Sequence, residues 1–149
     1  MASREIRDPI HGFIKISGTE CDIVDSAVFQ RLRKVRQLAM AYLVYPGAVH
    51  SRFEHTLGVR HVAGKMCERL SVDPEHTDTI QKAALLHDIG HGPFSHVSEQ
   101  VLEELGTEEL TTTAGEKDKI HEVVTRKIIR TDREIGDLIS AKQREDIIN

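Results

Sequence analysis

The pattern of apolar and polar positions along the chain is mainly helical, with one extended segment near the start. Residues 13–17 alternate apolar and polar side chains, as a strand does, and they follow a turn sequence, DPIHG, at 8–12. Over residues 25–38 the apolar positions fall three or four apart, which predicts a helix capped by Asp25. A loop should follow over residues 39–50, which contain a Pro-Gly pair.

Two helices in the middle of the chain have clear starting signals. Ser51 and Glu54 form a capping box, and Asp73 is a cap followed by proline at the first helical position. The first helix carries apolar side chains on one face, namely Leu57, Val62, Met66 and Leu70. The second should run to about Asp88 and bury a further set, namely Ile80, Ala83, Ala84 and Leu86. Three residues should then end it, namely Gly90, Gly92 and Pro93.

The last third of the chain predicts helices on both sides of a polar segment. A helix capped by Ser95 should end near residue 105, and residues 106–119 are the predicted mobile loop. A helix over 120–130 should follow, and residues 131–134 form a second capping box that starts another short helix. The pattern therefore predicts an all-α fold of about six helices.

Composition supports one helical domain. The 149 residues are 39% hydrophobic but only 4% aromatic, with no tryptophan, so the core must be aliphatic. Such a composition favours packed helices over a sandwich of strands. We therefore expect a single all-α domain over residues 1–149.

Charge and cysteine content limit the function classes. The net charge of -4 gives no basic excess of the kind that nucleic-acid-binding proteins carry, so nucleic acid is not an expected partner. Cys21 and Cys67 lie far apart and outside any CxxC motif, which indicates a reduced protein. No apolar signal segment or membrane-spanning run is present, so we expect a cytoplasmic protein without a membrane partner. One group of acidic residues reads as a solvated helix face: Glu99, Glu103, Glu104, Glu108 and Glu109.

The candidate chemistry centres on a histidine and an aspartate at the end of an apolar helix. His87 and Asp88 follow two leucines, and such a polar pair is costly to bury unless a partner satisfies it. Imidazole beside carboxylate suits a divalent metal, and His55, in the first turn of another helix, is a third candidate ligand. This mixed ligation admits Mn, Fe, Ni, Zn or Mg. A helix-terminal histidine beside a surface aspartate is the alternative.

Further residues around this group suit phosphate binding and proton transfer. Arg52 lies three residues before His55 on the same side of the helix, where it could bind a phosphate or simply pair with Glu54. His91 and His96 are candidates for moving protons, or one of them for bonding a backbone carbonyl. In a later helix, a glutamate next to a histidine could orient its ring: His121 and Glu122.

Five sequence blocks in order carry a family resemblance. They are DPIHG at 8–12, FQRLR at 29–33 with Gln37-Leu38, YPGA at 45–48, RFEHTLGV at 52–59 and HDIGHGPFSH at 87–96. Together they resemble the HD-domain superfamily of metal-dependent phosphohydrolases, and more closely its deoxynucleoside triphosphate triphosphohydrolase branch. The resemblance covers residues 4–130.

The resemblance implies a fold, a reaction and a set of site residues. The implied fold is an all-α HD-domain helical bundle, and the implied reaction hydrolyses a dNTP to deoxynucleoside and triphosphate. The implied ligands of one divalent metal ion are His55, His87 and Asp88. Gln37 and Arg52 match residues near the substrate. The implied catalytic residues are His91, His96, His121 and Glu122.

The resemblance also implies a homo-oligomer that an activating nucleotide binds at a subunit interface. The matching residues are Arg4, Asp25, Gln30 and Arg33. The family's fourth metal ligand is an aspartate well beyond the His-Glu pair, and no aspartate here lies in a matching context: Asp132, Asp137 and Asp146. We therefore expect the chain to be an N-terminal portion of a longer domain, with weaker metal binding and with its own activity open.

Two other functions remain open. The first is an HD phosphohydrolase that acts on another nucleotide or phosphoester, which its products would distinguish. The second is a nucleotide-sensing or assembly module with little catalysis, which the absence of bound or bindable metal would favour.

Overall fold

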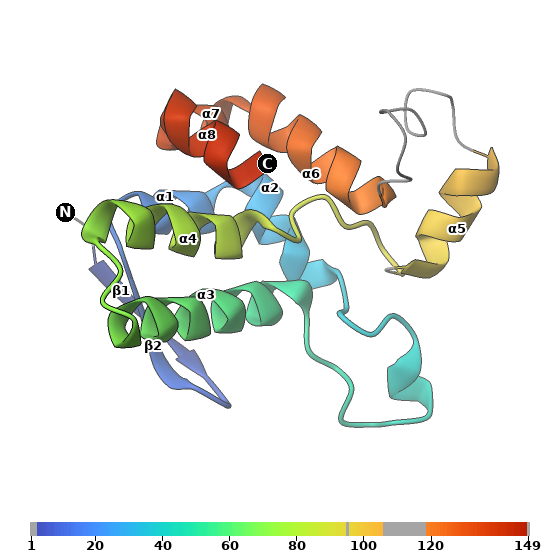
Figure 1. The fold of residues 1–149 in the computed structure, drawn as a ribbon. Helices are drawn as coiled ribbons and strands as arrows, with labels where there is room; N and C mark the ends of the chain where they lie inside the picture. Colours follow the sequence, from blue (N-terminus) through green and yellow to red (C-terminus); the bar gives the residue numbers. More distant parts are fainter. Residues whose placement is uncertain (1–2, 95, 106–118, 149) are drawn as a thin grey trace.

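A computed structural model describes residues 3–94, 96–105 and 119–148 (Figure 1). The chain opens with a hairpin of β1 (Ser3–Asp8) and β2 (Gly12–Ser17). All other elements are helical: α1 (Thr19–Asp25), α2 (Ala27–Gln30), the 3-10 turns η1 (Arg31–Lys34) and η2 (Ala41–Leu43), α3 (Arg52–Arg69), α4 (Pro74–Leu86), α5 (His96–Leu105), α6 (Ile120–Thr131), α7 (Arg133–Leu138) and α8 (Ala141–Ile148). The predicted helical fold class is confirmed, with one small sheet added.

The hairpin explains the alternating pattern of residues 13–17. These residues form β2, whose inward side chains Ile14 and Ile16 are buried. The partner strand β1, which the pattern did not predict, pairs antiparallel with it and sets Ile6 opposite Ile14. The predicted turn is also present, because the Asp8 carboxylate accepts the N–H groups of the two residues that follow Pro9.

The helix predicted over residues 25–38 is wrong in its start and its continuity. Asp25 ends α1, and Ser26 is the cap of α2, with its hydroxyl accepting the Phe29 N–H at 3.3 Å. At Val35 the backbone becomes extended, because its carbonyl accepts the Arg52 N–H at 2.8 Å. The Gln37 N–H likewise donates to the carbonyl of His50. Pairing with the segment before α3 thus replaces helical hydrogen bonds here.

The caps of α3 and α4 are confirmed. Ser51 and Glu54 form the full capping box of α3, and the Asp73 carboxylate accepts two N–H groups at the start of α4. α4 ends at Leu86, two residues before the predicted end.

The apolar faces predicted for α3 and α4 are only partly buried. Leu57 is buried, but the rest of its predicted face is exposed: Val62, Met66 and Leu70. On α4, Leu85 and Leu86 are buried, whereas Ile80 is exposed. The buried leucines are the last two residues of α4, where the helix enters the hydrophobic core.

The predicted capping box at residues 131–134 is wrong by one residue. Thr131 is the last residue of α6, and its hydroxyl donates back to the Lys127 carbonyl at 2.8 Å. Asp132 is the cap of α7, with its carboxylate accepting the Ile135 N–H at 3.0 Å. The predicted cap Ser95 and nearly all of the predicted mobile loop lie outside the described residues.

α3 and α4 run antiparallel side by side, and α6, α7 and α8 lie across the opposite side of α4 (Figure 1). The core between these layers is aliphatic apart from Cys21 and two phenylalanines. The rings of Phe29 and Phe53 meet edge to face at 5.4 Å. Its deepest members include Leu85, Leu86 and Ile89 at the end of α4. This packing places the residues just after α4 beneath α6.

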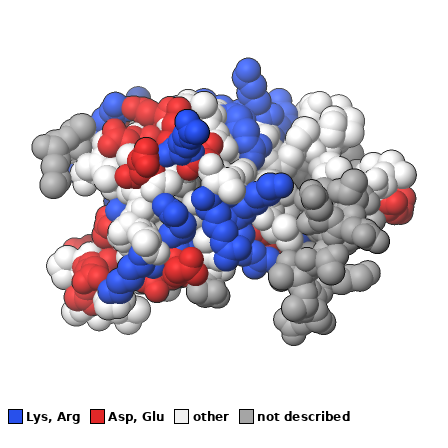
Figure 2. Space-filling model, turned by 90° about the horizontal axis from the view of Figure 1, so that it is seen from above, with Lys and Arg blue, Asp and Glu red and all other residues white. Residues whose placement is uncertain are grey.

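The surface over α6, α7 and α8 carries both signs of charge. Figure 2 shows lysine and arginine side chains gathered across the middle of this face and acidic side chains toward one end. Within the described residues, no helix is long and apolar enough to cross a membrane.

Candidate metal centre

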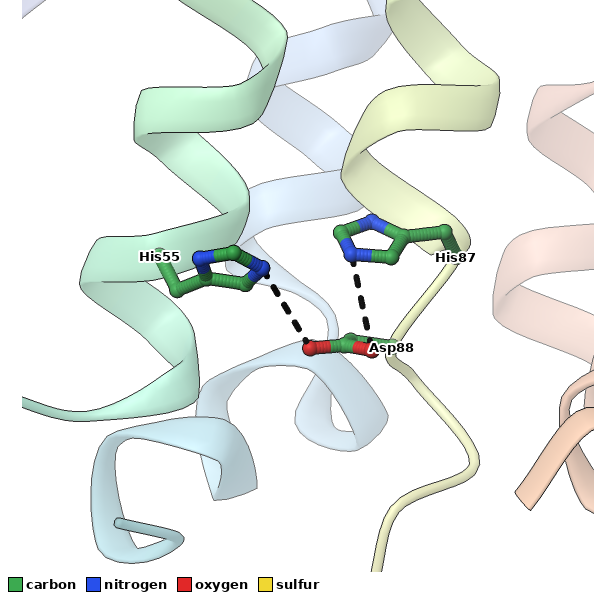
Figure 3. A group of neighbouring side chains, drawn as sticks. All are labelled: His55, His87 and Asp88. Carbon is green, nitrogen blue, oxygen red and sulfur yellow. Dashed lines mark ion pairs between the residues drawn. The ribbon is translucent and has the colours of Figure 1, made fainter. Parts of the chain in front are cut away.

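Antiparallel packing of α3 and α4 brings the first turn of α3 next to the end of α4. His55 lies in that first turn, and His87 and Asp88 follow the last residue of α4 (Figure 3). The three side chains point toward one another from these two elements. The structure therefore brings together the three residues that the sequence nominated as metal ligands.

The donor atoms of this group are spaced as ligands of one ion would be. His55 Nε2 lies 3.8 Å from Asp88 Oδ2, and His87 Nε2 lies 3.4 Å from Asp88 Oδ1. The three donors lie within 4.8 Å of one another. An ion about 2.0–2.2 Å from each donor separates pairs of donors by about 3–4 Å, and both distances to Asp88 lie in that range.

A backbone hydrogen bond orients the His87 ring, and partial burial affects the protonation of His55. His87 Nδ1 lies 2.8 Å from the Ala84 carbonyl oxygen, so this nitrogen donates a hydrogen bond and Nε2 is the nitrogen that faces Asp88. Partial burial lowers the pKa of His55 against the opposing charge of Asp88. The His55 ring is thereby favoured in the neutral form that a ligand needs.

Arg52 pairs with the candidate ligand Asp88 and not with its neighbour Glu54. Arg52 Nη1 donates to Asp88 Oδ2 at 2.6 Å, and the two side chains are 3% and 9% exposed. Burial alone would raise the pKa of Asp88, but His87 and the Arg52 guanidinium outweigh it and lower that pKa. Asp88 is therefore held ionised, as a ligand must be.

A second group of side chains adjoins the first through His91. His91 Nε2 lies 3.4 Å from Asp88 Oδ1, and His91 Nδ1 lies 3.3 Å from Glu99 Oε1. The same Glu99 oxygen accepts a 2.6 Å hydrogen bond from His121 Nδ1, and the two imidazole rings stack at 3.8 Å. The side chains of His91, Glu99 and His121 thus form one buried cluster beside the candidate metal ligands.

Glu99 occupies the place that the sequence analysis gave to Glu122. The Glu122 carboxylate lies 4.0 Å from His121 Nε2 and is half exposed. Glu99 was assigned to a solvated acidic face but is 8% exposed. Its one sequence signal is its position three residues after His96, on the helix that follows the HD segment, residues 87–96. His96 itself begins α5, and its side chain lies outside the described residues.

His91 is held uncharged by its surroundings. Burial and then the nearby Arg52 guanidinium lower the pKa of His91 to about 3. A ring with so low a pKa stays neutral at pH 7 and is a weak base, so it is better suited to placing a water by hydrogen bonding than to taking its proton.

Arg31, to which the sequence assigned no role, braces the segment after Asp88. Its guanidinium donates to the carbonyl oxygens of Ile89 and His91, the latter at 2.7 Å. Burial lowers the pKa of Arg31. The Arg31 guanidinium thus holds two backbone carbonyls beside the candidate site. No neighbouring residue in the sequence indicates this role.

The four residues matched to an activating-nucleotide site form a connected group. Arg4 pairs with Asp25 at 2.5 Å, and Gln30 donates to the Val24 carbonyl at the end of the same helix. Arg33 in turn donates to the Gln30 side chain at 2.8 Å, and its guanidinium lies 3.6 Å from the Phe53 ring centre. A cavity of about 520 Å³ includes Arg33 with other basic residues: Arg7, Lys34 and Arg36.

A second cavity, of about 500 Å³, opens beside His55. Its walls are mostly apolar and come from the hairpin turn and α3: Pro9, Ile10, Val59, Val62, Ala63 and Met66. Gln37, the second residue matched to substrate binding, is half-buried on the strand-like segment that pairs with His50.

The chain is similar to several known proteins. It matches the model of the HD domain family over residues 52–149. An uncharacterised protein of Methanocaldococcus jannaschii is 51% identical over 94 residues, which cover 63% of this chain and 20% of that protein. A deoxynucleoside triphosphate triphosphohydrolase SAMHD1 homologue of Dictyostelium discoideum is 44% identical over 112 residues, covering 70% of this chain and 22% of the relative.

Human SAMHD1, also named a deoxynucleoside triphosphate triphosphohydrolase, is 44% identical over 99 residues, covering 62% of this chain and 16% of that protein. Among solved structures, a hypothetical protein from Aquifex aeolicus matches with a TM-score of 0.80 at 36% identity. That match covers 99% of this chain and 37% of the other. The chain spans 16–22% of the length of the three curated relatives named here.

Proposed function

The chain belongs to the HD-domain family, and from this premise we propose that it acts as a metal-dependent phosphohydrolase that converts dNTPs to deoxynucleoside and triphosphate. The observation that carries the proposal is the convergence of His55, His87 and Asp88 at the meeting of α3 and α4. The names of the similar Dictyostelium and human proteins support the choice of substrate.

The proposed ligands of one divalent ion are His55, His87 and Asp88. A bound ion of this kind would polarise a phosphoryl oxygen and lower the pKa of a bound water. The mixed donor set accepts Mn, Fe, Ni, Zn or Mg. Arg52 keeps Asp88 ionised and therefore ready to bind the ion.

Arg52 and Gln37 are the proposed phosphate-binding residues. A guanidinium has five N–H donors, so a hydrogen bond to Asp88 is compatible with binding a phosphate. The positive charge would sit at the junction of the metal ligands and the triphosphate, where negative charge increases during the reaction.

The proposed hydrolysis forms a bond from a water oxygen to the α-phosphorus and breaks the bond from that phosphorus to the 5′ oxygen of the deoxyribose. His91 helps to place the attacking water, with Glu99 between it and His121, and the proton of this water is released to solvent. His96 supplies the proton to the departing 5′ oxygen. Glu122, half exposed and 4.0 Å from His121 Nε2, helps to orient this ring.

The test is product analysis. The purified protein is incubated with each of the four dNTPs and Mn²⁺, and the products are separated by ion-exchange chromatography. The proposal expects triphosphate and deoxynucleoside in equal amounts, and none from Asp88→Asn. Orthophosphate or a monophosphate would instead show an HD hydrolase of another specificity. Metal binding without turnover of any dNTP would overturn the substrate assignment, and a protein that binds no metal would favour a nucleotide-sensing role.

We also propose that a second nucleotide binds the group formed by Arg4, Asp25, Gln30 and Arg33 and promotes a homo-oligomer. The support is the connected arrangement of these residues beside a basic cavity. Sedimentation velocity with and without dNTP tests it. The expected result is a larger species with nucleotide in the unaltered protein and none in Arg33→Ala. Equal sedimentation in all four samples would contradict it.

A further inference from the structure

Helix α6 lies in direct backbone contact with the segment that follows Asp88. A Cβ atom added at Gly90 would lie 2.2 Å from the His121 carbonyl oxygen and 2.4 Å from the Thr125 nitrogen. Both distances are far below van der Waals contact, and the obstructing atoms belong to the backbone. Only glycine at position 90 therefore allows α6 to approach this closely.

One hydroxyl joins the two backbones at this contact. Thr125 Oγ1 accepts the Gly90 N–H at 2.9 Å and donates to the His87 carbonyl at 3.3 Å. Thr125 is 8% exposed, so both hydrogen bonds are shielded from water. The chain has left α4 at this point, and its backbone groups need partners from elsewhere.

The two bonded backbone groups lie on either side of Asp88. The carbonyl belongs to His87, itself a proposed ligand, and the N–H belongs to the residue two positions after Asp88. A single side chain therefore spans the segment from which two proposed ligands project. Loss of its hydroxyl would leave two buried backbone groups without this partner.

Thr125 also lies one helical turn after His121, on the same face of α6. His121 reaches Glu99 and stacks on His91 in the second cluster. The distance between α6 and residues 87–90 therefore determines how far the histidine cluster lies from the proposed metal ligands. The Thr125 hydroxyl forms its hydrogen bonds where α6 and these residues come closest.

We propose that Thr125 is a positioning residue of the metal centre, whose hydroxyl holds the His87–Asp88 segment against α6 so that the three donors converge. The inference rests on the proposed metal site. Thr125 touches neither metal nor substrate and acts through the backbone. Outer groups of this kind change metal affinity by about ten- to hundredfold when they are removed.

The experiment compares four variants of the purified protein for Mn²⁺ affinity by isothermal titration calorimetry. Thr125→Val keeps the branched shape but removes the hydroxyl, and Thr125→Ala removes it without a bulky side chain. Thr125→Ser restores the hydroxyl. Thr131→Val removes a hydroxyl from the exposed end of the same helix, where it donates to the Lys127 carbonyl. Far-UV circular dichroism and thermal unfolding confirm that each variant folds.

The proposal expects Val and Ala at position 125 to weaken Mn²⁺ binding by about tenfold or more, with Ser and Thr131→Val within about twofold of the unaltered protein. In the dNTP assay, kcat should fall with KM unchanged for the Val variant and recover with Ser. Equal Mn²⁺ affinity for the Val, Ala and Ser variants would overturn the positioning role.

The outcomes separate the two proposals. An unaltered protein that binds no Mn²⁺ overturns the metal centre and the role of Thr125 together. An unaltered protein that binds Mn²⁺ but releases no triphosphate overturns only the substrate, and the affinities of the variants still decide the role of Thr125.

Discussion

The Arg52 guanidinium donates a 2.6 Å hydrogen bond to the Asp88 carboxylate, and both side chains are almost fully buried. The bond joins the first turn of α3 to the second residue after α4. A buried ion pair of this kind serves two purposes here. It keeps a proposed metal ligand ionised, and it ties together the two elements that carry the three ligands.

Removal of one partner of this pair should destabilise the protein strongly. Arg52→Met leaves Asp88 as an uncompensated buried charge, and the free energy of unfolding should fall by about 3–5 kcal/mol. The double variant Arg52→Met with Asp88→Asn should recover part of this loss, because it leaves no buried charge. Urea unfolding with EDTA measures both. A loss below about 1 kcal/mol in Arg52→Met would contradict the structure of the pair.

Removal of a proposed ligand should weaken metal binding strongly, whereas removal of a distant histidine should not. His87→Ala should weaken Mn²⁺ binding by more than roughly hundredfold, which is the upper range for substitution of residues that only hydrogen-bond to a ligand. The matched control is His76→Ala, an exposed histidine at the other end of α4, which pairs with Asp73. Calorimetric titration with Mn²⁺ checks both variants, and similar affinities would show that the ion binds elsewhere.

Substitution of Gly90 should displace α6. Gly90→Ala places a Cβ against the His121 carbonyl and the Thr125 backbone, so we expect a loss of about 1–3 kcal/mol in the free energy of unfolding. Gly47→Ala is the matched control, since nothing lies within 4 Å of the added atom, and its effect should stay within about 0.5 kcal/mol. Thermal and urea unfolding measure both variants. Equal stabilities would exclude the close contact.

The protein should become less stable as the pH is lowered, because of His91. The unfolded chain protonates this ring near pH 6.5, whereas burial lowers the pKa in the folded protein to about 3. Between these values the unfolded state binds more protons, so the free energy of unfolding rises with pH. The stabilisation is complete above about pH 6.5 and is lost as pH falls toward 3. Asp88, whose pKa is lowered, adds to the acid end of this loss.

The measurement is urea unfolding at pH 4, 5, 6 and 7 in the presence of EDTA. His91→Gln should show a shallower dependence on pH than the unaltered protein, because its amide does not titrate. Parallel pH dependences in the two proteins would mean that His91 is not the group responsible.

Local patterns in the sequence were sufficient for the caps of α3 and α4, the turn after β1 and the nomination of His55, His87 and Asp88. A cap depends on residues within one turn of each other, and a ligand motif depends on residue types at close spacing. These features therefore follow from short segments of chain.

Only the tertiary structure decided which side chains surround the nominated ligands. Glu99 rather than Glu122 faces His121 Nδ1, Arg31 holds carbonyls nearly 60 positions away in sequence, and Thr125 bonds the HD segment from another helix. The same packing leaves Met66 exposed on a face that the spacing indicated as apolar. These outcomes depend on the distance and rotation of helices far apart in sequence, because close packing and buried hydrogen bonds select one arrangement from many with the same local pattern.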